Sequence, residues 1–415
     1  MKVTLVNTSD TIGGAAIVTV RLMEALRSEG IDARMIVQVK TSDNPQIVGL
    51  SDKKESYSFL AERAKIYFRN GFNREDLFKV STASDGYPLH KHEWIKDADI
   101  IILNWINQGL LSIKGVKKLC QLGKPVIWTM HDMWCLTGVC HHAHECQGFQ
   151  SWCGYCPYIK NGRKENDLSR TVWRKKKKLY DNSSIHFVPV SSWLADKCQE
   201  SMLLRGKLVS IIHNALPVES FYTAPKNKKR IYGIDISRNI IIMGAARIDD
   251  PIKGIEYAID GMNVFAEKYQ EIAKNTTILF FGDIRNPEIL KQLKLDYKHL
   301  GVIKNPDEIR ELYSISKVVL STSLYETLPG TLIEGMASGC IPVSFGYGGQ
   351  CDIIDHKQSG YISDYKSAES IADGIMWAFN APIGREELHE IAKERFSSQE
   401  IAQQYIALFN RLLSK

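Results

Sequence analysis

The stretch KVVLSTSLYETLPGTLIEGMASGCIPVSFGYGG (residues 317–349) contains two short apolar runs separated by a loop and an amphipathic segment. The apolar runs, KVVLSTS and CIPVSFG, have the length of buried strands, and TLIEGMAS between them has helical spacing. Two strands joined by a helix in this way pair in parallel within one sheet. The stretch therefore predicts a β-α-β unit of an α/β fold.

The same alternation of strand-like and helical segments extends over most of the chain. In the N-terminal half the predicted strands are VTLVN (3–7), ARMIVQV (33–39), DIIILNW (99–105), KPVIWTM (124–130) and IHFVPV (185–190). Further on, the predicted strands are NIIIMGAA (239–246), TTILFFGD (276–283) and HLGVI (299–303), with helices at KGIEYAIDGMNVFAEKY (253–269) and PDEIRELYSI (306–315). This pattern predicts doubly wound, parallel α/β sheets.

A chain of 415 residues is long enough for two domains of about 200 residues each. The segment HNALPVESFYTAPKNKKRIYGID (213–235) is rich in Pro, Asn and Lys and lacks periodicity, as expected of a linker. We predict a first Rossmann-like domain over residues 1–213 and a second over 214–397. The final amphipathic helix, about 398–415, has no strand after it and is expected to pack back on the first domain.

Composition is that of a folded protein, because 44% of the residues are hydrophobic and 24% are charged. No run approaches the ~18 apolar residues that span a bilayer, and the N-terminus MKVTLVNTSD lacks the apolar core of a signal peptide. We therefore expect a cytoplasmic protein. A net charge of +6 is small for a nucleic-acid-binding domain, so no nucleic-acid partner is expected.

Two carboxylates, Glu326 and Glu334, flank a loop-to-helix junction in the opening stretch. Pro329 suits a helix start, where the first backbone N–H groups have no partner within the helix and can hold phosphate oxygens. These are the N–H groups of Gly330, Thr331 and Leu332. Glu334, about one turn into the helix, can accept hydrogen bonds from two ribose hydroxyls, and Glu326 can accept them from a transferred sugar.

A second group of residues lies in GAARIDDPIKGI (244–255), where Arg247 and Lys253 follow a predicted strand. A departing nucleoside diphosphate gains negative charge in the transition state, and fixed cations aimed at it lower the barrier. The alternative interpretation is that both are surface cations on a loop.

The spacing of Glu326 and Glu334, followed by the Gly-rich PVSFGYGGQCDII (342–354), resembles the retaining family 4 glycosyltransferases with the GT-B fold. Their signature is Glu, seven residues and Glu in this setting. The resemblance covers nearly the whole chain and is greatest to polysaccharide-assembly members of the colanic-acid type. Those members carry text similar to LNWINQGLLS (103–112), WTMHDMWCLTGVCHH (128–142) and CGYCP (153–157).

The resemblance implies two facing Rossmann-like domains, a nucleotide-sugar donor, and a glycan or lipid-linked acceptor in surface polysaccharide biosynthesis. It also implies a catalytic set of Glu326, His131, Lys253 and Arg247. The family has an Arg and a Lys after the first strand of the second domain, although the spacing from Arg247 to Lys253 is one residue longer here. A His beside the donor sugar matches His131, which follows the strand KPVIWTM together with Asp132.

The loop after the first predicted strand contains Gly13 and Gly14, before a helical pattern from Ile17 to Ser28. Glycine permits close backbone approach to a ligand, and the pair resembles the N-terminal glycine loop of the family. By itself a Gly-Gly pair after a strand also fits a tight turn.

The expected chemistry uses no cofactor and no catalytic metal. Breaking the sugar–phosphate bond requires stabilisation of a leaving diphosphate, which side-chain cations and helix N–H groups can supply. Where a divalent ion bridges the diphosphate, an Asp-x-Asp pair is expected at a strand end. No such pair stands at a predicted strand end in this sequence. Glu326 is assigned to sugar binding and charge support, because no second carboxylate is poised for the double displacement of retaining hydrolases.

Three other classes of protein are alternatives. An NAD-dependent dehydrogenase fits poorly, because TIGGAA (11–16) is not G-x-G-x-x-G and ARMIVQV ends at Lys40 without an acidic residue for a ribose. A non-catalytic, zinc-bearing module that binds RNA through the cysteine cluster and the basic run leaves Glu326, Glu334 and Lys253 unexplained. Another Rossmann-type nucleotide enzyme stays open as an alternative. The base, the sugar and the acceptor are not specified by these residues.

The basic run RTVWRKKKK (170–178) is predicted to help dock the enzyme at the inner face of an anionic membrane that carries a lipid-linked acceptor. A solvated basic helix face is the alternative.

Nine cysteines are present, and five of them fall between Cys135 and Cys156. Four have the spacing C-x5-C-x6-C-x2-C and are predicted to form a structural zinc site: Cys140, Cys146, Cys153 and Cys156. The neighbouring His141, His142 and His144 are further candidate ligands. Disulfides and unligated thiols are the alternatives, and the expected reducing compartment disfavours disulfides.

Overall fold

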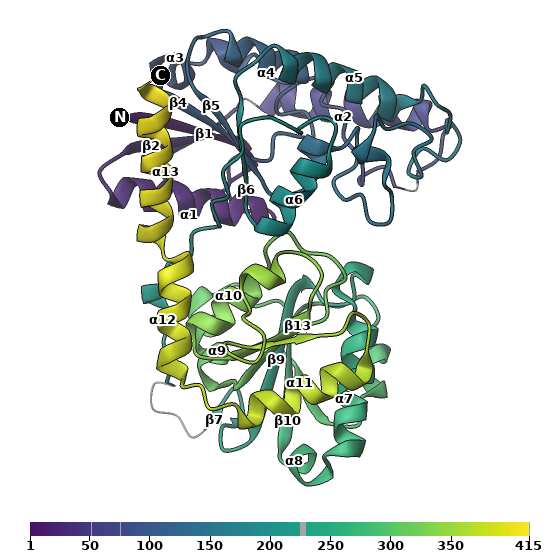
Figure 1. The fold of residues 1–415 in the computed structure, drawn as a ribbon, viewed down its shortest axis with the longest axis vertical. Helices are drawn as coiled ribbons and strands as arrows, with labels where there is room; N and C mark the ends of the chain where they lie inside the picture. Colours follow the sequence, from purple (N-terminus) through teal and green to yellow (C-terminus); the bar gives the residue numbers. More distant parts are fainter. Residues whose placement is uncertain (51, 75, 225–229, 415) are drawn as a thin grey trace. The chain divides into compact units, whose positions relative to one another are not determined.

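The computed structural model describes residues 1–414 apart from 51, 75 and 225–229 (Figure 1). The chain forms two compact units. Unit 1 comprises Met1–Ala215 together with Ser398–Lys415, and unit 2 comprises Leu216–Ser397.

Unit 1 contains a six-stranded sheet in the order β3-β2-β1-β4-β5-β6, and every neighbouring pair is parallel. Its strands are β1 (Lys2–Ser9), β2 (Asp32–Val39), β3 (Ile47–Gly49), β4 (Ile100–Leu103), β5 (Val126–Met130) and β6 (His186–Pro189). The strands β4, β5 and β6 are buried along their whole length, which explains their continuous apolar sequences.

The helices of unit 1 are α1 (Gly14–Ser28), α2 (Asp52–Arg69), α3 (Glu93–Asp97), α4 (Ile113–Cys120), α5 (Leu168–Asp181), α6 (Ser192–Glu200) and the C-terminal α13 (Ser398–Leu413). Helix α13 packs beside α1 and contributes Ile401, Tyr405 and Phe409 to the same core as Leu5 of β1. The Tyr405 hydroxyl lies 2.9 Å from Thr129 Oγ1 of β5.

Unit 2 repeats the arrangement with the order β11-β10-β9-β12-β13-β14, again parallel throughout. Its strands are β9 (Asn239–Arg247), β10 (Thr276–Asp283), β11 (Asp296–His299), β12 (Val318–Ser321), β13 (Ile341–Phe345) and β14 (Tyr361–Ser363), preceded by the hairpin β7 (Arg230–Ile231) and β8 (Ile234–Asp235). Its helices are α7 (Ile255–Lys268), α8 (Gln270–Lys274), α9 (Pro306–Ile315), α10 (Gly330–Ala337), α11 (Ala368–Asn380) and α12 (Arg385–Phe396).

The predicted strand HLGVI (299–303) is wrong. The strand at this place is β11, Asp296–His299, which pairs with β10 at the edge of the sheet. Its first three residues are exposed, so an edge strand of polar residues carries no apolar run that marks it. Leu300 follows the strand, and its N–H group donates to Phe280 of β10.

Each sheet has one point where the direction of strand order reverses: between β1 and β4 in unit 1, and between β9 and β12 in unit 2. Loops at the carboxyl ends of strands on either side of such a point border a crevice, which is the usual ligand position in open α/β sheets. No helix in the described part of the chain is long and apolar enough to cross a membrane.

Candidate active site

The reversal point of the unit 2 sheet brings Lys253 and Glu326 together. Lys253 ends a short 3-10 helix, Pro251–Lys253, shortly after β9, and Glu326 follows the adjacent strand β12. The Lys253 ammonium forms an ion pair with Glu326 Oε1. Their side chains are 28% and 20% exposed, so both remain within reach of a ligand.

Backbone contacts between the two loops hold this pair in place. Thr322 Oγ1 donates to the carbonyl oxygens of Gly254 at 2.9 Å and Lys253 at 3.2 Å, and the Leu324 N–H donates to Ile252 at 2.8 Å. Gly254 has a φ of 61°, and a Cβ there would lie 2.3 Å from the Thr322 oxygen. Only glycine permits this close approach of the β9 and β12 loops.

The Glu326 backbone is also fixed by the Gly-rich segment after β13. Glu326 forms an isolated parallel bridge with Gly348, and its carbonyl oxygen accepts from the Gly349 N–H at 3.0 Å. Gly348 has a φ of 117°, and a Cβ there would meet the Glu326 oxygen at 2.3 Å. The sequence marked this segment as Gly-rich without assigning these two residues a role in positioning Glu326.

Helix α10 begins at Gly330 with Pro329 as its N-cap residue, as predicted. One part of the prediction is wrong: the Leu332 N–H donates to the Pro329 carbonyl oxygen at 3.2 Å, so it is not available to a phosphate. This contact joins residues three positions apart, so the first turn of the helix has the tighter 3-10 geometry that is common at helix ends. A Cβ on Gly330 would meet no atom within 4 Å, so the space beside the helix start is open. Glu334 is the fifth residue of the helix and is partly exposed.

Arg247 ends β9, and its guanidinium is engaged by acidic neighbours. It donates to Asp250 Oδ2 at 2.5 Å, and its Nε lies 3.6 Å from Asp249 Oδ1. Two carboxylates therefore compensate this cation, whereas the Lys253 ammonium is paired with Glu326. The pair of neighbouring aspartates in the sequence was the available signal for this difference.

In unit 1, His131 directly follows β5, and its Nε2 lies 3.0 Å from Asn104 Oδ1 at the end of the adjacent strand β4. Burial lowers the pKa of His131 to about 4, although the Asp132 carboxylate acts in the opposite direction. The imidazole is therefore neutral near pH 7 and can exchange hydrogen bonds with a sugar hydroxyl without carrying charge.

Asp132 is buried, although its place beside His131 at the end of a strand suggested a more exposed side chain. Its carboxylate accepts from His141 Nδ1 at 2.6 Å, from Trp105 Nε1 at 2.9 Å and from the Trp134 N–H at 2.8 Å. Burial raises the pKa of Asp132, but contact with His141 outweighs this and lowers it to about 2. Asp132 is thus a buried structural anion, and His141 is its partner.

Gly13 and Gly14 lie where predicted, between β1 and α1. Gly13 is the N-cap of α1 and has a φ of 87°, which favours glycine, and a Cβ on either residue would meet no atom within 4 Å. The preceding Asp10 fixes this loop, because its buried carboxylate accepts from Thr41 and Ser42 after β2 at 2.6–3.2 Å. Sequence reasoning missed Asp10.

The basic run 170–178 lies on α5, and two of its six cations are not available to a membrane. Arg170 is buried and donates to the Trp152 and Cys153 carbonyl oxygens. Lys176 is fully buried, and Lys177 pairs with Asp181. Arg174, Lys175 and Lys178 are exposed. The buried positions Val172, Trp173, Leu179 and Tyr180 show that the inner face of this helix passes through Lys176.

Two parallel sheets of six strands, each with the dinucleotide-binding strand order, define the class of the protein as a GT-B fold. Solved structures agree: Anabaena HepE in complex with UDP and glucose has a TM-score of 0.65 at 16% identity, with 99% of both chains covered. Sucrose-phosphate synthase from Thermosynechococcus elongatus has a TM-score of 0.65 at 15% identity, with 100% of this chain and 99% of that chain covered.

Residues 226–395 match the family model described as glycosyl transferases group 1. The predicted resemblance to GT-B glycosyltransferases is thereby confirmed. A putative colanic acid biosynthesis glycosyl transferase of Escherichia coli, WcaC, is 24% identical over 36% of this chain and 38% of its own length. N-acetyl-alpha-D-glucosaminyl L-malate synthase of Bacillus anthracis is 27% identical over 50% of this chain and 55% of its own length. The chain spans only about half the length of such curated relatives, or less.

Proposed function

We propose that the protein transfers a sugar from a nucleotide-sugar donor, with retention of anomeric configuration, onto a glycan or lipid-linked acceptor in surface polysaccharide biosynthesis. The observation that carries this proposal is the Lys253–Glu326 ion pair at the reversal point of the sheet, inside the segment that matches the group 1 glycosyl transferases. The names of two similar proteins support the substrate class: one binds UDP and glucose, and one is assigned to colanic acid biosynthesis.

Unit 2 binds the donor in this proposal. The N–H groups of Gly330 and Thr331 at the start of α10 hold diphosphate oxygens, helped by the positive end of the helix dipole. Glu334 accepts hydrogen bonds from the ribose, and Glu326 accepts them from the sugar. When the donor binds, the diphosphate competes with Glu326 for the Lys253 ammonium, which places a cation at the departing group.

Retention follows from attack on the same face of the sugar that the leaving group occupies. The bond from the anomeric carbon to the diphosphate oxygen breaks, the acceptor oxygen bonds to that carbon, and the acceptor proton passes to the diphosphate. Lys253 and the α10 N–H groups supply the positive potential that a divalent ion supplies in other enzymes, which supports a reaction without a catalytic metal. Arg247 has a weaker claim to a direct role, because Asp249 and Asp250 already compensate its charge.

Unit 1 takes the acceptor side in this proposal, with Gly13, Gly14 and the neutral His131 at the carboxyl ends of its strands. We place the enzyme in the cytoplasm at the inner face of the membrane, where lipid-linked acceptors are assembled. The exposed cations Arg174, Lys175 and Lys178 of α5 are the residues available for that contact.

The deciding experiment incubates the purified full chain with a panel of uridine, guanosine and adenosine diphosphate sugars and measures release of the free nucleoside diphosphate. One donor should be turned over by the wild-type protein, and Glu326→Gln should abolish that signal. Binding of a nucleotide sugar without turnover, in the presence of lipid and glycan acceptors, would favour a non-catalytic binding module. Reduction of a nicotinamide cofactor would favour another Rossmann-type enzyme.

A further inference from the structure

The segment 131–167 between β5 and α5 has almost no regular structure, yet much of it is buried. Its helical parts are two single 3-10 turns, Trp134–Leu136 and Gly148–Gln150. Within it, Thr137, Val139 and Cys140 are buried. A connection of this length without helices or strands requires something other than backbone ladders to order it.

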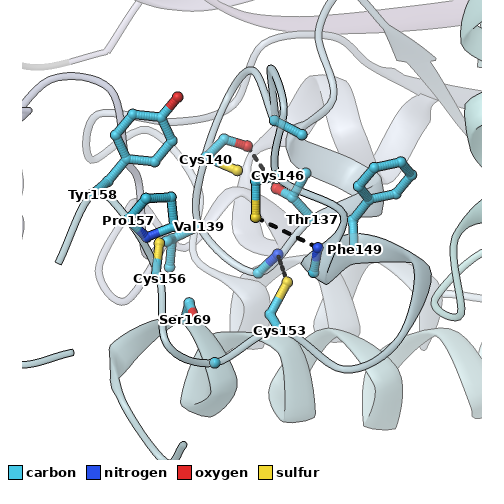
Figure 2. Close-up of a pocket in the computed structure, with 14 residues that line it drawn as sticks. Thr137, Val139, Cys140, Cys146, Phe149, Cys153, Cys156, Pro157, Tyr158 and Ser169 are labelled. Carbon is cyan, nitrogen blue, oxygen red and sulfur yellow. Dashed lines mark hydrogen bonds between the residues drawn. The ribbon is translucent and has the colours of Figure 1, made fainter. Parts of the chain in front are cut away.

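Four thiols of this segment surround one small cavity, shown in Figure 2. The cavity has a volume of about 20 Å³ and is lined by Cys140, Cys146, Cys153 and Cys156. All four thiols are in the reduced form. A cavity of this size has room for about one water-sized particle.

Backbone N–H groups are directed at two of the sulfurs. The Gly138 N–H donates to Cys153 Sγ at 3.2 Å, and the Gly148 N–H donates to Cys146 Sγ at 3.5 Å (Figure 2). Gly138 must be glycine for this approach, because a Cβ there would lie 2.6 Å from the Ser169 carbonyl oxygen. Donors of this kind favour a thiolate, although burial has the larger effect and raises the pKa of Cys153 to about 12.

Two buried cations from α5 border the same segment. Lys176 is fully buried, donates to the carbonyl oxygens of Trp134 at 2.5 Å and Thr137 at 3.1 Å, and lies 3.3 Å from the Trp134 ring centre. Arg170 donates to the Cys153 carbonyl oxygen at 3.4 Å and forms an ion pair with Glu165 at 3.4 Å. Burial lowers the pKa of Lys176 to about 7. A buried ammonium held by neutral carbonyls is costly, so a nearby anionic group is its expected complement.

We propose that Cys140, Cys146, Cys153 and Cys156 bind one structural zinc ion. Four thiols lose their protons on binding and form a tetrahedral complex with a net charge of −2, which Lys176 and Arg170 offset. The site has no open position for substrate, so the ion orders the segment rather than taking part in catalysis. His141 is not a ligand, because both ring nitrogens are already hydrogen-bonded. Nδ1 lies 2.6 Å from Asp132 Oδ2, and Nε2 lies 3.0 Å from Ser81 Oγ.

Binding requires the sulfurs to move closer together. In the described part of the chain, no three His, Cys, Asp or Glu side chains already stand in an arrangement that could hold a metal ion. Zinc–sulfur bonds are about 2.3 Å long, so the four sulfurs must turn toward the shared cavity from their present positions. Rotation about the Cα–Cβ bond of each cysteine moves its sulfur without changing the backbone.

The test measures metal content in the full chain purified without chelator. We expect about one zinc per chain in the wild type and in the control Cys120→Ser, whose partly buried thiol lies on α4. The double variant Cys153→Ser/Cys156→Ser should contain at least five-fold less zinc. Wild-type protein that is metal-free, or that contains iron instead, overturns the proposal. So does wild-type protein with fewer than nine titratable thiols after unfolding in chelator, since this shows disulfides.

A second comparison tests the site without removing a ligand. Lys176→Met removes the buried positive charge, and Lys178→Met removes an exposed one from the same helix. A chromogenic chelator should take zinc from Lys176→Met at least ten-fold faster than from the wild type, whereas Lys178→Met should match the wild type. Equal release rates from all three proteins contradict the charge compensation on which the site depends. The metal content of the wild type decides the proposal even if a variant fails to fold.

Discussion

The Lys253 ammonium and the Glu326 carboxylate partly neutralise each other at the reversal point of the unit 2 sheet. Both are fixed by loop contacts, so neither has to be ordered when a donor binds. Preorganised charge of this kind acts on the transition state without the cost of reorienting solvent or side chains.

We predict that Glu326→Gln and Lys253→Ala each lower turnover by at least ~100-fold, the scale of one preorganised charge contact, while the fold stays intact. Glu334→Gln should mainly raise the KM for the donor. Steady-state kinetics and circular dichroism provide the measurement. Lys291→Ala is the matched control, because Lys291 forms an exposed ion pair with Glu288 in the same unit. Near-normal turnover of either of the first two variants would show that the site lies elsewhere.

His131 provides a prediction for pH. Its pKa is about 4 in the folded protein, against about 6.5 in an unfolded chain. The unfolded state therefore binds more protons between pH 4 and 6.5, so stability contributed by the neutral ring is present above pH 6.5 and is lost as the pH falls toward 4. We expect this window to cost the wild type roughly 2 kcal/mol, less than the full linkage value because the ring is partly exposed.

His131→Asn should show a shallower fall in stability between pH 6.5 and 4 than the wild type. Urea unfolding at closely spaced pH values gives the two slopes. Identical slopes in the two proteins would mean that His131 is not buried as a neutral ring.

The structural position of a residue was predictable from sequence where it follows a strand, as with Lys253, Glu326 and His131. The state of a residue was not predictable where a neighbour decides it. Arg247 forms an ion pair with Asp250, and the Leu332 N–H donates to the Pro329 carbonyl oxygen. Both contacts depend on loop geometry that the periodicity of the sequence does not encode.

The loop after β13 supports the loop that carries Glu326. Gly348→Ala would place a Cβ 2.3 Å from the Glu326 oxygen at a φ of 117°. We predict a loss of about 2 kcal/mol in stability together with a fall in turnover, because the strain displaces the catalytic loop. Gly384→Ala is the control, since a Cβ there meets no atom within 4 Å. Thermal unfolding and kinetics measure both effects, and equal behaviour of the two variants would remove the support role.

Helix α5 presents three exposed cations, Arg174, Lys175 and Lys178. We predict that the protein sediments with anionic liposomes at low salt, with up to about 1 kcal/mol from each cation, and that neutralising all three releases it. Neutralising the exposed Lys274 of unit 2 should have no effect. Binding that is indifferent to salt and to these residues would leave α5 as an ordinary solvated helix.

Helices and strands with a strong pattern were predictable from sequence: PDEIRELYSI coincides with α9, Pro306–Ile315, and TTILFFGD with β10, Thr276–Asp283. Edge strands were not. The polar β11 is held by pairing with β10 rather than by its own apolar residues, so its existence depends on a neighbour that lies elsewhere in the chain.

At the scale of the whole molecule, unit 1 is built from both ends of the chain, because α13 completes the core that α1, β1 and β2 begin. The side chains of Ile401, Tyr405 and Phe409 are at most 1% exposed. They form the apolar face of the amphipathic last helix, which is buried against unit 1. The periodicity showed that one face of this helix is buried. Which unit provides the matching surface depends on packing between residues far apart in the chain, as in the Tyr405–Thr129 contact with its separation of 276 residues.

Phe409→Ala should therefore destabilise unit 1 although it lies six residues from the end of the chain. Removing a fully buried Phe costs about 3–5 kcal/mol through lost burial and the cavity left behind. Tryptophan fluorescence during urea unfolding reports mainly on unit 1, because seven of the eight tryptophans lie before residue 215 and only Trp377 lies in unit 2. Leu413→Ala, on the same helix but 46% exposed, should shift the midpoint little. If the two variants unfold at the same urea concentration, α13 does not contribute to the core of unit 1 and the assignment of the chain end to that unit is incorrect.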